Sequence, residues 1–271
     1  MSLRFVTVAK WLLALVLVLY LAAHAYMFFF QRSLQYNVSG TTLIPSELGI
    51  EDVQVVKIPT GNDKQLHAWY APSTQGKPTI IYYRGNTGSF TREHERFTQF
   101  MADGYGFLSL DYRGFPGSPG ELNQTNILQD ALAAFDWVAM HDEQILLWGR
   151  SLGSGVATYV ASEREAVALA LESPYTATVD VAKERYPYLL VNLVMQDHFP
   201  SREWMKSVEE PVFIGHGTAD DVIPVEHGHR LFDIVTSPKQ KWIVDGADHD
   251  NLWANRIWDQ VQPFYEQALA R

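Results

Sequence analysis

Apolar and polar positions alternate in blocks along most of the chain, and each block has the length of one strand or one helix. Eight short apolar runs are typical of strands, at residues 51–58, 65–70, 79–83, 106–110, 144–148, 167–171, 211–215 and 240–244. Stretches with helical character alternate with these runs or follow them, at residues 90–101, 126–140, 224–235 and 252–269. Strands separated by helices predict an α/β fold, with a mostly parallel eight-stranded sheet and helices on both faces.

Residues 175–207 interrupt this alternation and predict a short helical lid over the carboxyl edge of the sheet. Within this segment, residues 186–195 are apolar on nearly every side, so a helix there has to bury both faces. In one interpretation the second face touches a bilayer or lines an acyl pocket, for which the candidate residues are Tyr175, Leu189 and Leu190. The alternative is that both faces belong to an ordinary core.

The amino-terminal part differs from the rest, because residues 11–30 carry no formal charge and are interrupted only by His24. A helix of this length spans about 30 Å, the thickness of the hydrocarbon core of a bilayer. Arg4 and Lys10 precede the run, which predicts a cytoplasmic amino terminus with the remainder of the chain across the membrane. We therefore expect a membrane anchor at residues 1–31, a linker at 32–50 and one large folded domain at 51–271.

A cleaved signal peptide is the alternative for this segment. Residues 23–25 read Ala-His-Ala, which has the small-x-small form of a cleavage site, and cleavage there would release a secreted chain. Residues 26–30 extend the apolar run beyond that site with aromatic side chains suited to a membrane interface, which favours an uncleaved anchor.

Composition narrows the classes of function. The chain has 271 residues, of which 47% are hydrophobic and 19% are charged, as expected for one large folded domain. A formal net charge of -10 argues against nucleic acid as a partner, because its phosphates would be repelled. The sequence has no cysteine, which excludes disulfides, thiolate chemistry and cysteine-ligated metals.

The most informative motif is Gly-x-Ser-x-Gly at residues 149–153, which follows the predicted strand 144–148 and precedes a run of small apolar residues. A serine on a sharp turn between a strand and a helix stands at the edge of the sheet with its hydroxyl exposed. Gly149 and Gly153 permit the turn, because a Cβ at either position would meet neighbouring backbone. The motif predicts Ser151 as a nucleophile; the alternative is a helix-capping serine.

A serine nucleophile needs a base, and the base needs an acid that orients it. His249 lies directly after the last predicted strand, where a base that faces Ser151 is expected. Asp220 and Asp221 both follow the strand at 211–215, and we expect Asp220 to be the acid and Asp221 to cap the next helix. The resulting chain order Ser, Asp, His is that of α/β-hydrolases. His227 and His229 lie within the predicted helix at 224–235, and we expect both at the surface.

Acyl transfer also needs backbone donors for the oxyanion that forms. The glycine-rich loop after the strand at 79–83 contains Arg84, Gly85 and Asn86, and we expect the amides of Asn86 and Leu152 to be the donors. Arg84 either supports this loop or is solvated. The turn-rich loop at 111–120 is interpreted as structural.

These stretches together resemble the α/β-hydrolase superfamily, in particular its membrane-anchored, short-lidded members. Residues 84–88 are similar to the superfamily's His-Gly-Asn-x-Gly loop, with arginine in the first position. Residues 111–114 read Asp-Tyr-Arg-Gly, and residues 220–224 have the Asp-x-x-x-Pro pattern, which supports Asp220 over Asp221 as the acid. The resemblance covers roughly residues 51–271, and related proteins are esterases, lysophospholipases, acyl-protein thioesterases and peptidases.

The sequence therefore predicts a serine hydrolase that cleaves an acyl ester or thioester of a small-molecule, lipid or acylated substrate through an acyl-enzyme. No metal and no organic cofactor is implied. One alternative is a serine peptidase of the same fold, and another is a catalytically silent, membrane-tethered binding module. The presence of Ser151, Asp220 and His249 together argues against the silent module, since a binding protein has no need of all three.

Overall fold

The centre of the structure is one eight-stranded sheet with the order β1-β2-β4-β3-β5-β6-β7-β8. The computed structural model describes residues 3–74 and 76–271. The strands are β1 (Gln54–Thr60), β2 (Lys64–Ala71), β3 (Thr79–Tyr83), β4 (Gly106–Leu110), β5 (Ile145–Arg150), β6 (Ala168–Glu172), β7 (Val212–Gly217) and β8 (Lys239–Val244). β2 is antiparallel to β1 and β4, and all other neighbouring strands are parallel. The prediction of a mostly parallel eight-stranded sheet is confirmed.

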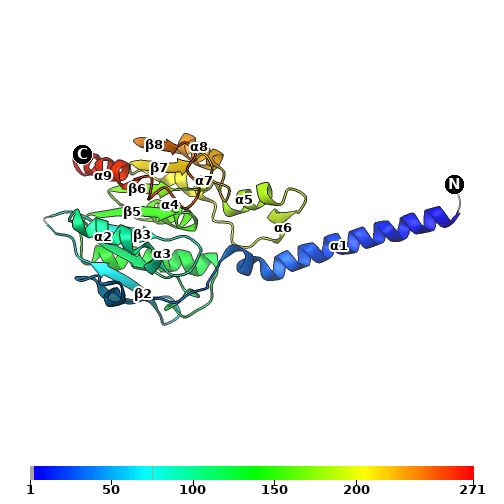
Figure 1. Ribbon diagram of the computed structural model, residues 1–271, viewed down its shortest axis with the longest axis horizontal. Helices are drawn as coiled ribbons and strands as arrows, with labels where there is room; N and C mark the ends of the chain where they lie inside the picture. Colours follow the sequence, from blue (N-terminus) through cyan, green and yellow to red (C-terminus); the bar gives the residue numbers. More distant parts are fainter. Residues whose placement is uncertain (1–2, 75) are drawn as a thin grey trace.

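Helices cover both faces of this sheet, as predicted (Figure 1). Successive side chains of β3 point to opposite faces, so Ile81 and Tyr83 belong to one core cluster and Ile80 and Tyr82 to the other. The first cluster is completed by α3 (Gln124–Ala139), α4 (Leu152–Glu163) and α8 (Val225–Ile234). The second is completed by α2 (His94–Ala102) and α9 (Trp258–Leu269). A central strand buried on both faces explains its continuous apolar sequence.

Two predicted helices begin later than their apolar patterns suggest. A 3-10 turn, η2 (Phe90–Glu93), precedes α2, where one helix was expected over residues 90–101. The last helix was expected from residue 252, but α9 begins at Trp258 after a series of turns. Arg256 has a φ of 66°, a left-handed backbone conformation that a right-handed helix excludes.

Residues 175–207 form short helices rather than one continuous helix. They are α5 (Thr178–Arg185), α6 (Val191–Val194), α7 (Ser201–Trp204) and the 3-10 turn η3 (Met205–Ser207). The expected helix over residues 186–195 is therefore wrong. Tyr186 has φ -129° and ψ 63°, outside the helical region, because the residue before Pro187 is restricted away from it.

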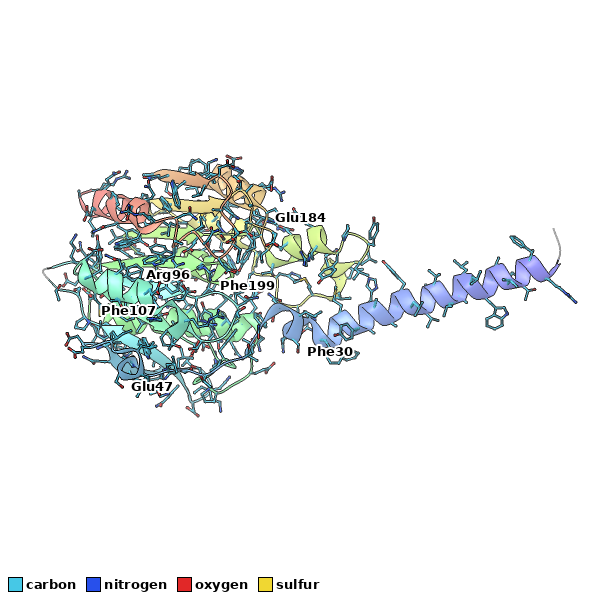
Figure 2. All side chains as sticks on the ribbon, in the orientation of Figure 1. Phe30, Glu47, Arg96, Phe107, Glu184 and Phe199 are labelled. Atoms are coloured by element: carbon cyan, nitrogen blue, oxygen red, sulfur yellow. The ribbon has the colours of Figure 1, made fainter. Side chains whose placement is uncertain are left out.

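Helix α1 (Leu3–Gln35) projects away from the sheet, and only its inner end lies beside α6 (Figure 1). Its 33 residues have a length of about 50 Å. Among the described residues it is the one helix long and apolar enough to cross a membrane. Side chains along its outer part, residues 4–23, are exposed all round, and Phe30 near the body is exposed as well (Figure 2). The helix continues to Gln35, so the predicted linker at 32–50 begins inside it.

Close packing at the junction of β5 and α4 leads to a test of the fold. A methyl group on Gly153 would overlap the carbonyl oxygen of Tyr83, so we expect Gly153→Ala to lower the free energy of unfolding by about 3 kcal/mol. Glu163→Ala, at the exposed end of α4, is the control and should change it by less than about 1 kcal/mol. Thermal unfolding in detergent micelles measures both. Equal unfolding temperatures for the two variants would contradict the close packing.

Candidate active site

Ser151 occupies a sharp turn between β5 and α4. It has φ 52° and ψ -120°, a left-handed conformation that costs a residue with a side chain on the order of 1–3 kcal/mol. Its amide donates to the carbonyl oxygen of Glu172 over 2.9 Å, which ties the turn to the end of β6. Gly149 and Gly153 allow α4 to begin directly against the sheet, since a Cβ on either would overlap backbone atoms. The expected strand-turn-helix geometry is present.

The structure brings together the three residues that the sequence assigns to nucleophile, base and acid. His249 Nε2 lies 2.9 Å from Ser151 Oγ, and His249 Nδ1 lies 2.8 Å from Asp220 Oδ2. They come from the turns after β5, β8 and β7, which leave the same edge of the sheet because these strands are parallel. All three are largely buried, so water competes little for their hydrogen bonds.

The Asp220 carboxylate is held in its charged form. Burial would raise its pKa, but hydrogen bonds from His216 and His249 outweigh burial and leave the pKa well below the ordinary range. The second oxygen, Oδ1, accepts the amides of Val222 and Ile223 over 3.0 and 2.8 Å. A carboxylate with all four contacts has a single orientation toward His249.

His216 is a partner of the acid that the sequence analysis missed. Its Nε2 lies 3.2 Å from Asp220 Oδ2 and 2.8 Å from the carbonyl oxygen of Ile223. It stands near the end of β7 and is fully buried. A histidine inside an apolar strand, four positions before the acid, is the sequence signal that indicated this contact.

Two expectations near the acid are wrong. Asp221 is exposed and does not cap α8, whose N-cap position is held by Pro224, because Asp220 itself binds the amides of this loop. His227 is buried rather than at the surface, and its Nδ1 accepts the amide of Thr176 over 3.2 Å. Burial lowers the pKa of His227, so the side chain is neutral at pH 7. His229 is half-buried, 3.0 Å from the ammonium group of Lys241.

Arg84 supports the glycine-rich loop rather than facing solvent. Its side chain is buried and donates to the carbonyl oxygens of Thr87 and Gly88 over 2.6 and 2.5 Å. Its Nη1 also lies 3.4 Å from Asp111 Oδ1. The loops that begin at residues 84 and 111 are therefore joined by a buried ion pair, which agrees with a structural role for the second loop.

Asn86 and Leu152, the predicted oxyanion donors, border the same cavity as Ser151. Leu152 is the first residue of α4, where amides have no partner within the helix. The side-chain amide of Asn86 donates to the carbonyl oxygen of Gln35 over 2.7 Å. The main-chain carbonyl oxygen of Asn86 accepts the amide of Asn37 over 2.9 Å. The end of α1 thus holds the loop in which Asn86 lies.

A buried charge network lies beneath Ser151. Glu172 accepts two hydrogen bonds from Arg96, over 2.7 and 2.9 Å, and a third from the indole of Trp148 over 3.1 Å. Arg150 Nε lies 3.5 Å from the same carboxylate. A fully buried carboxylate between two guanidinium groups is stable only while all of these partners remain.

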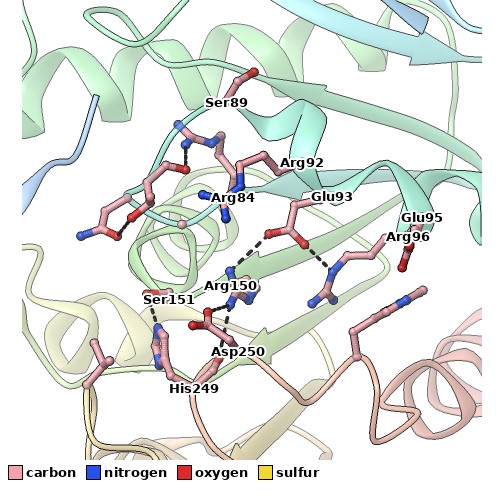
Figure 3. A pocket seen from close by; sticks show the side chains of 15 residues that line it. Arg84, Ser89, Arg92, Glu93, Glu95, Arg96, Arg150, Ser151, His249 and Asp250 are labelled. Atoms are coloured by element: carbon pink, nitrogen blue, oxygen red, sulfur yellow. Dashed lines mark hydrogen bonds and ion pairs between the residues drawn. The ribbon is translucent and has the colours of Figure 1, made fainter. Parts of the chain in front are cut away.

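Arg150 connects this network to the loop that carries His249 (Figure 3). Its guanidinium donates to Glu93 over 3.2 Å, to Asp250 over 2.5 Å and to the carbonyl oxygen of His249 over 3.3 Å. Burial would raise the pKa of Glu93, but the charges of Arg96 and Arg150 outweigh it and lower the pKa. Arg150 is a variable position of the Gly-x-Ser-x-Gly motif, so the motif itself gave no signal for this role.

Two cavities meet at Ser151, which borders both of them together with Asn86 and Val222. The first has a volume of about 550 Å³ and is lined mainly by charged and polar side chains (Figure 3). The second, of about 480 Å³, is lined mainly by apolar groups of α1, the segment 175–207 and the loop at 221–224. In the described part of the chain, no group of three His, Asp or Glu side chains is arranged to hold a metal ion.

Of the three residues predicted to line an acyl pocket, Tyr175 borders the apolar cavity, whereas Leu189 and Leu190 do not. The hydroxyl of Tyr175 donates to the carbonyl oxygen of Leu152 over 3.0 Å. Leu189 packs instead in a small cluster with Met27, and Leu190 is 49% exposed. The physical reason is the break at Pro187, which turns these leucines away from the cavity.

Comparisons with known proteins agree with this fold. No family model matches the chain. The uncharacterized protein MT2364 of Mycobacterium tuberculosis is 31% identical over 227 residues, which cover 82% of this chain and 81% of that protein. The lysophosphatidylserine lipase ABHD12 of Rattus norvegicus is 32% identical over 194 residues, 61% of this chain and 48% of the lipase. The esterase Pf2001 of Pyrococcus furiosus has the same fold, with a TM-score of 0.70 at 22% identity, over 85% of this chain and 97% of the esterase.

The strand order, the turn at Ser151 and these relatives together define the class of protein. The chain belongs to the α/β-hydrolase superfamily.

The charge network beneath Ser151 leads to a second prediction. Glu172→Gln should lower the free energy of unfolding by about 3–5 kcal/mol, because Arg96 and Arg150 lose the charge that compensates their burial. The matched control is Glu163→Gln, an exposed position where the change should stay below about 1 kcal/mol. Thermal unfolding of the two variants in the same detergent gives the comparison. A Glu172→Gln protein as stable as the control would refute the structural importance of the network.

Proposed function

We propose that this protein is a membrane-anchored serine hydrolase in which Ser151 is the nucleophile, His249 the general base and Asp220 the orienting acid. The observation that carries the proposal is the hydrogen-bonded series Ser151–His249–Asp220, with distances of 2.9 and 2.8 Å. Because the pKa of Asp220 is lowered, its carboxylate stays ionised at neutral pH. An ionised acceptor on His249 Nδ1 places the ring proton there and leaves Nε2 free to accept the proton of Ser151.

The reaction follows from these positions. Ser151 Oγ attacks the acyl carbonyl carbon while His249 Nε2 takes its proton, and the amides of Asn86 and Leu152 stabilise the oxyanion. The protonated imidazole then gives the proton to the leaving oxygen or sulfur, and an acyl-enzyme remains on Ser151. Water attacks this acyl-enzyme with His249 again as the base, which releases the acid and restores the free serine.

The two cavities support a substrate with an apolar acyl part and a polar head, such as a lysophospholipid. The apolar cavity and the charged cavity lie on two sides of Ser151, so the ester bond between tail and head would lie beside Oγ. The similarity to the lysophosphatidylserine lipase ABHD12 supports the same class of lipid. An ester is the leading substrate, and a thioester fits the same mechanism.

Helix α1 supports a location at a membrane. Apolar side chains along its outer part, such as Trp11, Leu13 and Leu17, are 54–74% exposed, which is the arrangement of a helix whose side chains face lipid. Arg4 and Lys10 favour a cytoplasmic amino terminus, with the catalytic domain on the opposite side. Secretion after cleavage at residues 23–25 is the alternative outcome of the test below.

The catalytic assignment predicts severe losses of activity. Ser151→Ala and His249→Ala should each lower kcat for an acyl ester by about 10⁴-fold or more, while the proteins remain folded. Asp220→Asn should cause a loss of similar order, because its amide cannot keep the ring proton of His249 on Nδ1. Initial rates with a phenyl ester, together with circular dichroism, measure activity and folding.

The neighbouring position provides the control for the acid. Asp221→Asn should retain activity close to the wild type, since Asp221 is exposed and Asp220 makes the contact to His249. A severe effect at Asp221 with a mild effect at Asp220 would show that the acid is wrongly assigned.

The anchor assignment predicts a fractionation result. The full chain should stay in the membrane pellet after carbonate or high-salt washing, because neither treatment extracts an apolar helix that crosses the bilayer. The catalytic domain should be digested by protease added from the non-cytoplasmic side. A soluble chain that begins near Tyr26 would instead show that the segment is a cleaved signal peptide.

A further inference from the structure

One side of α1 differs from the rest of this helix, and that side faces the segment 175–207. Met27 and Gln31 are 7% and 5% exposed, whereas Phe28, Phe29 and Phe30 between them are 44–76% exposed. His24, Met27, Gln31 and Leu34 follow a spacing of three and four residues, so they share one face of the helix. A helix that only crosses a bilayer needs no such face.

Polar contacts fix this face against residues 190–197. Gln31 uses both ends of its amide, since Nε2 donates to Val194 O over 2.9 Å and Oε1 accepts the amide of Gln196 over 2.6 Å. The amide of Leu190 donates to His24 Nε2 over 3.0 Å. Tyr36, just beyond the helix, donates its hydroxyl proton to Asp197 over 2.9 Å. The contacts therefore extend along about three turns of α1.

Apolar packing reinforces the same contact. Met27 forms a small buried cluster with Ala177, Val179 and Val191, which belong to α5, α6 and the chain before them. This cluster is separate from the two core clusters that cover the sheet. Segment 175–207 thus has a hydrophobic contact of its own with the membrane helix.

The apolar cavity of about 480 Å³ lies where this contact meets the catalytic serine. Met27, Gln31, Leu34 and Gln35 of α1 border it on one side, and Ser151 borders it as well. The loop of Asn86 is fixed to the same helix end, through the hydrogen bond from its side chain to Gln35 O. The cavity therefore includes the membrane helix as part of its wall.

We propose that the inner end of α1 is an acyl-binding element of the active site, in which Met27 and Leu34 contact the fatty-acyl chain of the substrate. The proposal rests on the function proposed above and adds that the anchor itself binds substrate. An acyl chain fits this cavity better than the charged one, because its methylenes gain contact only with apolar groups.

The surroundings of the cavity indicate where the acyl chain comes from. Four apolar or aromatic side chains near the cavity are 44–88% exposed: Tyr186, Tyr188, Leu190 and Leu193. They lie on the segment whose Leu190 amide donates a hydrogen bond to His24 of α1. This exposed apolar surface continues that of α1, so both contact the same bilayer. A lipid whose tail leaves that bilayer then reaches the cavity without crossing water.

The test uses the full-length protein in detergent micelles and compares acetyl and octanoyl esters of the same phenol. Leu34→Trp narrows the cavity and Leu34→Asp adds a charge to its wall; Leu34 is 55% exposed, so both variants should fold. Ser33→Trp and Ser33→Asp are matched controls, because Ser33 is exposed and its side chain lies about 100° around the helix.

We expect the ratio of kcat/KM for octanoyl over acetyl ester to fall about fifteen-fold in both Leu34 variants. Each methylene that loses apolar contact changes this ratio about four-fold, and the substitutions should displace two or more of them. The Ser33 variants should keep the wild-type ratio. Thermal unfolding temperatures close to the wild type should accompany all four substitutions.

Failure of this inference and failure of the proposed function give different results. If the wild type cleaves the esters but Leu34 variants keep its ratio, or if the wild type has no preference for octanoyl, α1 does not bind the acyl chain. Unfolding of both Leu34 variants would also contradict the inference, since a half-exposed wall position tolerates replacement. A folded wild type that cleaves neither ester would refute the proposed function together with the inference.

Discussion

The site depends on one constraint, the left-handed backbone of Ser151 between β5 and α4. A side chain in this conformation is strained, and the strain is balanced because α4 packs directly on the sheet through Gly149 and Gly153. The hydrogen bond from the Ser151 amide to the carbonyl oxygen of Glu172 fixes the turn from the neighbouring strand. This geometry places Oγ at the edge of the sheet, where His249 approaches it from the turn after β8.

The remaining site is built around that turn by the topology of the sheet. β5, β7 and β8 run parallel, so the segments that follow them leave at the same edge, although Ser151 and Asp220 lie far apart in the sequence. Buried ion pairs then hold these segments at fixed positions, with Arg150 between Glu172 and the His249 loop and Arg84 between the two loops that follow β3 and β4. Such pairs are costly to break, because the loss of one partner leaves the other charge buried and uncompensated.

The features of the fold and of the site that depend on local sequence patterns were predictable. Strand positions follow from short apolar runs, and the residues at Ser151, Asp220 and His249 follow from motifs placed after predicted strands. The contacts of Arg150 were not predictable, because they join segments that are distant in sequence. The contact of His216 with Asp220 was missed, although a histidine inside an apolar strand four positions before the acid indicated it. The lining of the apolar cavity was predicted only in part. Leu189 and Leu190 lie after Pro187 and outside a helix, so they do not border the cavity. The contribution of α1 was missed, because nothing in its apolar pattern distinguishes a face toward lipid from a face toward Ser151.

The central claim is that Ser151 is the nucleophile that forms the acyl-enzyme. Its most direct test is to treat the full-length protein with a fluorophosphonate and to locate the adduct by peptide mass spectrometry. The geometry predicts one adduct on the peptide that contains Ser151, formed slowly or not at all in the His249→Ala variant because the serine keeps its proton. Adduct formation at another residue, or ester hydrolysis by a protein in which Ser151 stays unmodified and the reagent has no effect, would contradict the claim.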